Sequence, residues 1–248
     1  MMKNKILKLI AQKFPYLGKF KRFLTALIHA ISPIKKTYAQ HKEDEYIFNL
    51  LKYYNLKNAI YIDVGANHPT SISNTYLFYR IGLNGIVIEP NKELIQLHKI
   101  FRKKDIPLQV GCSNEPGIFP FYHSKIPVLS SFDYSTFKNN KIQSEKNYWY
   151  KEYIPILKLD DIIKHIDIKF NFIFLLNIDV EGLDYKVLLG AENTITKTLF
   201  VCIEFNNEEQ KKQINDFLEN RNFTLMNQIS CNLIFKNKDL KFESYLKK

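Results

Sequence analysis

The sequence predicts an α/β fold built on a mostly parallel, doubly wound sheet. Residues 61–67 read Tyr-Ile-Asp-Val-Gly-Ala-Asn and residues 86–90 read Ile-Val-Ile-Glu-Pro, so each is an apolar run that stops abruptly at polar groups. Buried parallel strands end in this way where they reach the open edge of a sheet. Segments with helical periodicity alternate with such runs along the chain, which is the order that βαβ units produce.

The first half of the chain supplies the first strands and the helices between them. Apolar residues three and four positions apart predict helices, and short apolar runs bounded by glycine, proline or asparagine predict strands. Pro69-Thr70-Ser71 is a suitable capping sequence for the second helix. In order, the expected elements are a helix over 43–54, a strand over 59–64, a helix over 71–81, a strand over 86–89, a helix over 92–103, a strand over 107–110 and one arm of a hairpin over 118–122.

The second half interrupts this alternation and then resumes it. Residues 123–150 are polar and aromatic without clear periodicity, which predicts a long loop or a small insert. The run over 172–178 is almost entirely apolar, as in a strand buried on both faces. Two final runs lie close enough in sequence to form an antiparallel hairpin. In order, the expected elements are a strand over 154–157, a helix over 159–166, a strand over 172–178, a helix from 184, a strand over 199–205, a helix over 208–220 and strands over 223–228 and 231–236.

Charge divides the chain into an arm, residues 1–36, and one globular domain, residues 37–248. With 248 residues and 46% hydrophobic content, the chain can build a sizeable core. Residues 1–40 hold nine Lys and Arg residues and no acid, which leaves 27 of the 36 basic residues and all 25 acidic residues for the remainder. The net charge of +11 therefore belongs mainly to the arm, and a nucleic-acid-binding body is not expected.

The arm has the pattern of a basic amphipathic helix or helix pair. Such a helix can lie on an anionic membrane surface, or it can pack its apolar stripe on the domain or on a second copy of the chain. The apolar run over 23–34 is too short to cross a bilayer, and the lysines at 35 and 36 argue against a signal peptide. The apolar positions are Ile6, Leu9, Ile10, Phe14, Phe20, Phe23, Leu24, Leu27, Ile28 and Ile31.

The two polar strand ends predict a site for a nucleoside cofactor. In a doubly wound sheet, ligands bind outside the carboxyl ends of the strands, beside the first crossover. Glu89 could accept both ribose hydroxyls, and Gly65 would let the ligand approach the backbone. No G-x-G-x-x-G follows to seat a pyrophosphate, and Asp63 suits an ammonium or sulfonium centre. These residues favour S-adenosylmethionine over NAD; the alternative is that Asp63 caps a turn and Glu89 is solvated.

Four blocks of the chain resemble, in order, the motifs of FkbM-type S-adenosylmethionine-dependent methyltransferases. The resemblance covers roughly residues 37–236, and the Asp-Val-Glu-Gly block is its most specific part. His68-Pro69 stands where members of that family often carry a glycine after the asparagine. The blocks are Asp63-Val-Gly-Ala-Asn67, Ile88-Glu-Pro90, Leu159-Asp-Asp-Ile162 and Ile178-Asp-Val-Glu-Gly182, preceded by a Q-x-x-E-D segment at 40–44.

The resemblance implies a fold and a set of cofactor-binding residues. The fold would be the Rossmann-like, seven-stranded sheet of class I methyltransferases, with a C-terminal antiparallel hairpin and an N-terminal helical arm. Glu89 would bind the ribose, Asn114 would reach the adenine edge, and Gln40 and Asp44 would close over the methionine end, unless they are surface charges. The remaining cofactor-binding residues would be Asp63, Gly65 and Asn67.

Acidic and amide residues after the later strands predict the acceptor side of the site. Unpaired carboxylates facing one another cost stability unless a cation or a raised pKa relieves the repulsion. Asp179 and Glu181, with His68, are therefore the expected catalytic residues. Asp179, Glu204 and Asn206 form a plausible oxygen-ligand set for Mg²⁺, which would orient two sugar hydroxyls. Alternatively, the acids cap the following helices and the histidine is structural.

Together these features predict an S-adenosylmethionine-dependent O-methyltransferase acting on a small hydroxylated acceptor. The resemblance suggests a sugar or sugar nucleotide of surface polysaccharide (capsule) synthesis, with residues 123–150 near the acceptor. The alternatives are an N-methyltransferase, a non-catalytic nucleotide-binding accessory protein and a NAD(P)-linked oxidoreductase. Three widely spaced cysteines without C-x-x-C indicate a reduced cytoplasm, with peripheral contact at the inner face of the membrane or homo-oligomerisation through the arm as further expectations.

Overall fold

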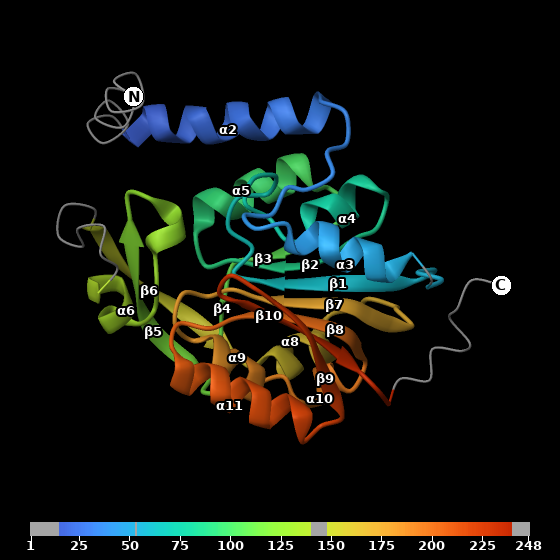
Figure 1. The fold of residues 1–248 in the computed structure, drawn as a ribbon. Coiled ribbons are helices and arrows are strands. Elements are labelled where there is room, and N and C mark those ends of the chain that lie inside the picture. The colour runs from blue at the N-terminus through green and yellow to red at the C-terminus, as the bar shows by residue number, and fades with distance from the viewer. Residues whose placement is uncertain (1–14, 53, 140–147, 240–248) are drawn as a thin grey trace.

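A seven-stranded sheet forms the centre of the computed structural model, which describes residues 15–52, 54–139 and 148–239 (Figure 1). The strand order is β3-β2-β1-β7-β8-β10-β9. The first five of these strands are parallel, and β10 runs antiparallel to both of its neighbours. This confirms the predicted α/β class and the closing hairpin. The strands are β1 (Ala59–Val64), β2 (Gly85–Ile88), β3 (Ile106–Leu108), β7 (Phe172–Ile178), β8 (Thr198–Glu204), β9 (Phe223–Ile229) and β10 (Asn232–Asn237).

Helices cover both faces of this sheet, which explains why its central strands are buried along their whole length and mostly apolar (Figure 1). One face carries α3, α4 and α5, and the other carries α8 to α11. The helices are α3 (Glu43–Leu51), α4 (Tyr76–Arg80), α5 (Lys92–Phe101), α8 (Leu159–His165), α9 (Asp184–Leu189), α10 (Glu192–Ile195) and α11 (Glu208–Glu219).

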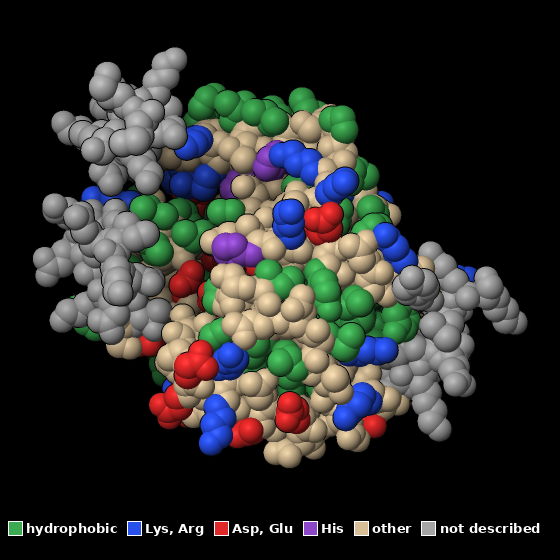
Figure 2. All heavy atoms as spheres, viewed as in Figure 1, with side chains coloured by type: hydrophobic (Ala, Val, Ile, Leu, Met, Phe, Trp, Pro, Cys, Tyr) green, Lys and Arg blue, Asp and Glu red, His purple; other side chains and the backbone are tan. Residues whose placement is uncertain are grey.

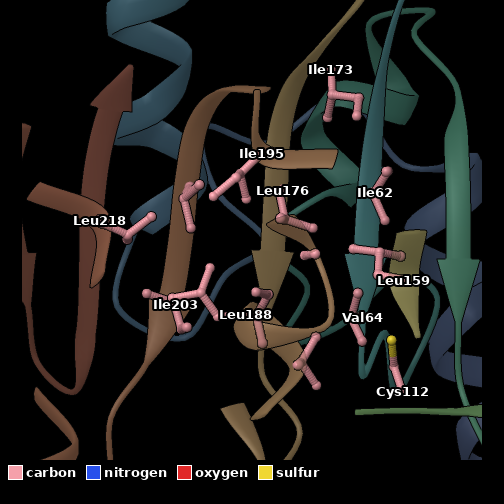
Figure 3. Close-up of a cluster of buried hydrophobic side chains, with 14 of the residues drawn as sticks. Ile62, Val64, Cys112, Leu159, Ile173, Leu176, Leu188, Ile195, Ile203 and Leu218 are labelled. Carbon is pink, nitrogen blue, oxygen red and sulfur yellow. The ribbon is translucent and has the colours of Figure 1, made fainter. Parts of the chain in front are cut away.

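Alternate residues of β1 enter separate hydrophobic cores. Ile62 and Val64 pack with Leu188 of α9 and Leu176 of β7 on one face (Figure 3). Tyr61, on the opposite face, packs in the core that includes residues from α3 and α4. Because β1 and β7 are buried along their length, their register is strongly specified and their carboxyl ends are held side by side.

A second sheet of three strands lies beside the first (Figure 1), and it includes the two ends of residues 123–150, for which the sequence predicts a long loop or a small insert. Its order is β4-β6-β5, with β6 parallel to β4 and antiparallel to β5. The ends of the expected loop belong to β5 and β6, while residues 140–147 lie outside the described residues. The side chains over 148–151 are all exposed, so no alternation marks them as a strand. The added elements are β4 (Gly111–Cys112), β5 (Gly117–Ser124), η1 (Pro127–Leu129), α6 (Tyr134–Asn139) and β6 (Tyr148–Leu157).

The helix expected over 71–81 begins only at Tyr76. The preceding residues form a hydrogen-bonded bend instead: Ser73 N–H donates to the carbonyl of Tyr38 at 3.1 Å, and Ile72 has a φ of 53°. The Thr75 hydroxyl donates to the Asp63 carboxylate. These local contacts compete with helix formation, and they bring the bend to the end of β1.

The N-terminal arm contains the single described helix α2 (Pro15–Ile31), and residues 1–14 lie outside the described residues. Its inward face makes polar and apolar contacts: Arg22 Nε donates to Glu93 at 2.8 Å, His29 Nδ1 lies 2.7 Å from the carbonyl of Thr70, and the rings of Phe23 and Phe101 lie 5.3 Å apart. Of the predicted apolar stripe, Phe23 thus packs on the domain, whereas Phe20, Leu24, Leu27, Ile28 and Ile31 face outward and are 38–76% exposed. No helix within the described part of the chain is long and apolar enough to span a bilayer.

Candidate active site

A cleft opens where β1, β2 and β7 end. Asp63 and Asp179 enter it from neighbouring strands, and Glu89 directly follows β2. The second sheet, η1 and the segment after η1 supply part of its wall through Cys112, Phe121, Pro127 and Phe132. The cleft therefore lies at the carboxyl edge of a doubly wound sheet, where the topology predicts ligand binding.

The turn after β1 holds the ends of two strands together. The backbone N–H groups of Gly65 and Ala66 donate to the carbonyl of Ile88 at 2.9 and 3.1 Å. Gly65 has a φ of 82°, and a Cβ there would overlap the carbonyl oxygen of Asp179. The backbone just after β7 therefore requires glycine at this position, and Gly65 also lines the cleft.

Substitution of this glycine should prevent stable folding. We expect Gly65→Ala to lose more than about 4 kcal/mol of the free energy of unfolding, because left-handed strain adds to a backbone overlap that no side chain can relieve. Gly82→Ala is the matched control: Gly82 also has a positive φ, 102°, but its Cβ would have no atom within 4 Å. Its cost should be about 1–2 kcal/mol. Equal losses in urea unfolding would contradict the role of the Asp179 carbonyl.

Glu89 is a buried carboxylate held by two backbone groups. Its Oε2 accepts from Asn67 N–H at 2.9 Å and its Oε1 accepts from Asn91 N–H at 2.7 Å. Burial raises its pKa to about 7, and the nearby Asp63 adds to the rise while the two backbone hydrogen bonds oppose it. Each oxygen keeps a further lone pair for a ligand, so the group can accept from two adjacent hydroxyls.

Asp63 is fixed by a buried polar network rather than left to solvent. Its oxygens accept from the Thr75 hydroxyl and from Asn177 Nδ2, the latter at 2.9 Å. The fully buried Arg102 guanidinium lies 4.0 Å away and is anchored by Asp105 at 2.6 Å. Burial raises the pKa of Asp63, and Arg102 opposes that rise. The network holds the carboxylate rigidly at one wall of the cleft.

Three acids gather at the other end of the cleft. Oxygens of Asp179, Glu181 and Glu204 lie within 4.8 Å of one another. Burial raises the pKa of Glu204 to about 8, and burial together with the adjacent Glu204 raises that of Asp179 well above its usual range. Cys231 Sγ donates to Glu204 Oε1 at 3.3 Å, and Asp179 lies close enough to Glu204 for the two carboxyl groups to titrate together.

The raised pKa of Glu204 should make the protein less stable as pH rises. The folded state raises the pKa of Glu204 from 4.5 to about 8, so it binds the proton more tightly than the unfolded state does. Stability should therefore fall as pH rises through this window and level off above it. Glu204→Gln should be more stable than the wild type by roughly 2–4 kcal/mol at pH above about 8, and similar to it below about 4.

Urea unfolding at both pH extremes measures this difference. Glu209→Gln, at an exposed position of α11, is the control and should change neither value. If Glu204→Gln were no more stable than the wild type at high pH, the ionised Glu204 carboxylate would not destabilise the folded protein.

Several of the expected site residues lie away from the cleft. Asn206 directs its amide at Asp184 Oδ2 and Gln210 Oε1, both at 3.4 Å, so Glu181 takes its place in the acid cluster. Asp44 accepts from Tyr38 N–H at 2.7 Å, from the Thr37 hydroxyl and from Glu45 N–H, and thereby ties down the segment before α3.

His68 and Asn114 are also outside the lining of the cleft. His68 Nε2 lies 3.0 Å from the carbonyl of Arg22 and its Nδ1 accepts from Thr70 N–H at 3.3 Å, so both ring nitrogens are engaged beneath α2. Asn114 Oδ1 accepts from the Ser113 hydroxyl. The expected residues that do line the cleft are Gln40, Asp63, Gly65, Asn67, Glu89, Asp179, Glu181 and Glu204.

Two asparagines contribute to the cleft that the sequence patterns do not single out. Asn74 Nδ2 donates to Asn177 Oδ1 at 2.9 Å, and Asn177 in turn donates to Asp63. Both line the cleft. Asn177 is a single polar residue near the end of an otherwise apolar strand, and this pattern in the sequence could have identified it as a site residue.

Comparisons with known proteins agree with this arrangement. Residues 63–225, well over half of the chain, match the family model of the methyltransferase FkbM domain. No curated protein sequence matches the chain. Among solved structures, a crystal structure described as a presumed rRNA-methylase from Clostridium thermocellum is similar, with 7% identity, a TM-score of 0.43 and coverage of 77% of this chain and 93% of that one. That TM-score is too low for any further conclusion.

Proposed function

Since the chain belongs to the FkbM methyltransferase domain family, we propose that it is an O-methyltransferase that uses S-adenosylmethionine. The proposed acceptor is a hydroxyl group of a sugar or sugar nucleotide used in surface polysaccharide (capsule) synthesis. The observation that carries this proposal is the pairing, within one cleft, of the buried Glu89 carboxylate, held by two backbone N–H groups, with the cluster of Asp179, Glu181 and Glu204. One end suits an adenosyl group, and the other suits a hydroxyl that must lose a proton.

The residues at the end of β2 fit the cofactor. Glu89 retains lone pairs for two ribose hydroxyls, while Asn67 and Asn91 keep its oxygens in place. Gln40, on the segment before α3, lines the same cleft and would enclose the methionine end. The rigidly held Asp63 places negative charge where an ammonium group would be favoured. S-adenosylmethionine supplies an electrophilic methyl group on its sulfonium sulfur.

The acid pair provides a base for the acceptor. Glu204, whose pKa burial raises to about 8, can take the hydroxyl proton once it has lost its own, while Cys231 Sγ, which donates to Glu204 Oε1 at 3.3 Å, orients the carboxylate. Asp184 accepts from Val180 N–H at 2.9 Å and from Gly182 N–H at 3.0 Å, which fixes the turn that carries Glu181. General base catalysis of this kind contributes about 10²–10⁴-fold to a rate.

A magnesium-assisted transfer is the second candidate, because Glu204 Oε2 is buried without a hydrogen-bond partner. Asp179, Glu181 and Glu204 offer the oxygen ligands that a hard cation prefers. A cation bound there would replace a proton in relieving the repulsion between the acids. It would also lower the pKa of a coordinated hydroxyl.

A screen of sugar nucleotides with S-adenosylmethionine, with and without EDTA, tests both candidates. Mass spectrometry should detect a gain of one methyl group, and fragmentation should place it on oxygen. Activity that survives EDTA supports Glu204 as a general base without a metal. Activity that is lost in EDTA and restored by Mg²⁺ supports the magnesium-assisted transfer. Methyl transfer to nitrogen would correct the reaction type. A protein that binds the cofactor yet methylates no acceptor in the screen would favour the accessory-protein alternative.

A further inference from the structure

The outward face of α2 presents a continuous apolar stripe to solvent. Its members recur at helical spacing, so they share one side of the helix. Figure 2 shows hydrophobic side chains along this edge of the molecule, over α2. We call this set the outer stripe: Phe20 (66% exposed), Leu24 (42%), Leu27 (38%), Ile28 (49%) and Ile31 (76%).

The opposite face of α2 is fastened to the domain, so the helix cannot turn its stripe inward without losing these contacts. Arg22 pairs with Glu93, and His29 Nδ1 contacts the Thr70 carbonyl. Arg80 Nη2 donates to the carbonyl of Ser32 at 2.8 Å, just beyond the helix. A soluble helix normally buries its apolar side and exposes its polar side. This helix buries Ala26 and packs Phe23 on Phe101, but it leaves the five larger side chains of the outer stripe exposed, which indicates a surface for a partner.

The charges around the outer stripe favour an anionic partner. Lys19 and Lys21 lie on either side of the stripe by helical position, and Lys35 and Lys36 follow the helix, all of them exposed. No acidic residue occurs from residue 1 to residue 42. Two copies of this chain docked through their stripes would bring lysines together without a carboxylate on either arm to compensate. An anionic lipid surface supplies the missing charge.

We propose that α2 lies in the plane of a membrane interface and inserts the outer stripe among the lipids of an anionic leaflet. The stripe enters the boundary between headgroups and acyl chains, and the flanking lysines contact lipid phosphates. The inference is independent of the reaction that the cleft carries out. The polar contacts between α2 and α5 would then hold the domain at the membrane surface.

Vesicle flotation with the full-length protein tests this inference. The protein should float with vesicles of phosphatidylcholine and phosphatidylglycerol, and binding should weaken by about tenfold on pure phosphatidylcholine or in high salt. The double variant Leu24→Gln/Ile31→Gln should lose at least about tenfold in vesicle affinity, because both side chains are exposed and need not disturb folding. Ile118→Gln, at a 71% exposed position of β5, is the matched control and should bind like the wild type.

Light scattering coupled to size-exclusion chromatography tests the alternative, in which a second copy of the chain covers the outer stripe. A monomer in solution that floats with anionic vesicles supports the proposal. A wild-type protein that does not float, or a stripe variant that floats as well as the control, overturns it. A dimer that the stripe variant dissociates, in a protein that ignores vesicles, assigns the stripe to a second copy of the chain instead.

Discussion

Replacing Glu89 by alanine should weaken the binding of S-adenosylmethionine by at least about 100-fold. Hydrogen bonds to a charged group contribute roughly 1.5–3 kcal/mol each, and this carboxylate is placed to accept two of them from a ribose. The substitution also releases the backbone N–H groups of Asn67 and Asn91, which border the same cleft. Titration calorimetry with the cofactor and with S-adenosylhomocysteine measures the effect.

Two further variants distinguish a binding defect from a general loss of structure. Glu89→Gln keeps the size and one acceptor oxygen, so it should bind with intermediate affinity, roughly 10-fold weaker than the wild type. Glu209→Ala removes an exposed carboxylate from α11 and should bind normally. Wild-type affinity in a folded Glu89→Ala protein would show that the adenosyl group does not depend on this carboxylate.

Replacing Asp179 by alanine should spare cofactor binding and reduce turnover by about 10²–10⁴-fold, the usual contribution of a positioned base. Asp179 and Glu204 lie close enough to titrate together, so removing either carboxyl group alters the pKa of the other. Single-turnover methylation measures the rate, and calorimetry with S-adenosylhomocysteine confirms that binding remains within about threefold.

Asp179→Asn is the informative companion. Its amide can still donate to Glu204, so it should retain more activity than Asp179→Ala if the pair carries one proton. The rate of the wild type should rise with pH through about 8, as Glu204 loses its proton, and the rise should move to lower pH in Asp179→Asn because one acid of the pair has been removed. Full activity of Asp179→Ala would show that the acid cluster takes no part in methyl transfer.

The sheet was predictable because strands buried on both faces require nearly continuous runs of apolar residues, which are easy to recognise in the sequence. The runs that became β1 and β7 are apolar except for Asp63 and Asn177, and these two residues and those that follow line the cleft. The strand β6 was predicted only over its last four residues, since its first residues are exposed on both sides and show no alternation. The start of α4 was placed too early because side-chain hydrogen bonds, which leave no periodic signal, hold residues 71–75 in a bend.

The candidate site was predictable where residues follow strands and not where turns redirect them. Glu89 and Asp179 lie in the cleft because topology places every parallel strand end on one edge. Glu181 joins the acid cluster through a left-handed backbone, φ 55°, whereas the sequence pointed to Asn206, which Asp184 and Gln210 hold elsewhere. Likewise, helical periodicity identified the stripe of α2 but carried no information on which face would meet the domain.

A crystal structure of the protein with S-adenosylhomocysteine tests the central claim most directly. The account predicts the ribose hydroxyls within hydrogen-bonding distance of the Glu89 carboxylate, the sulfur turned toward Asp179, and the adenosyl group across the ends of β1 and β2. Density for the nucleoside anywhere else, or a ribose that leaves Glu89 bound only to Asn67 and Asn91, would contradict it.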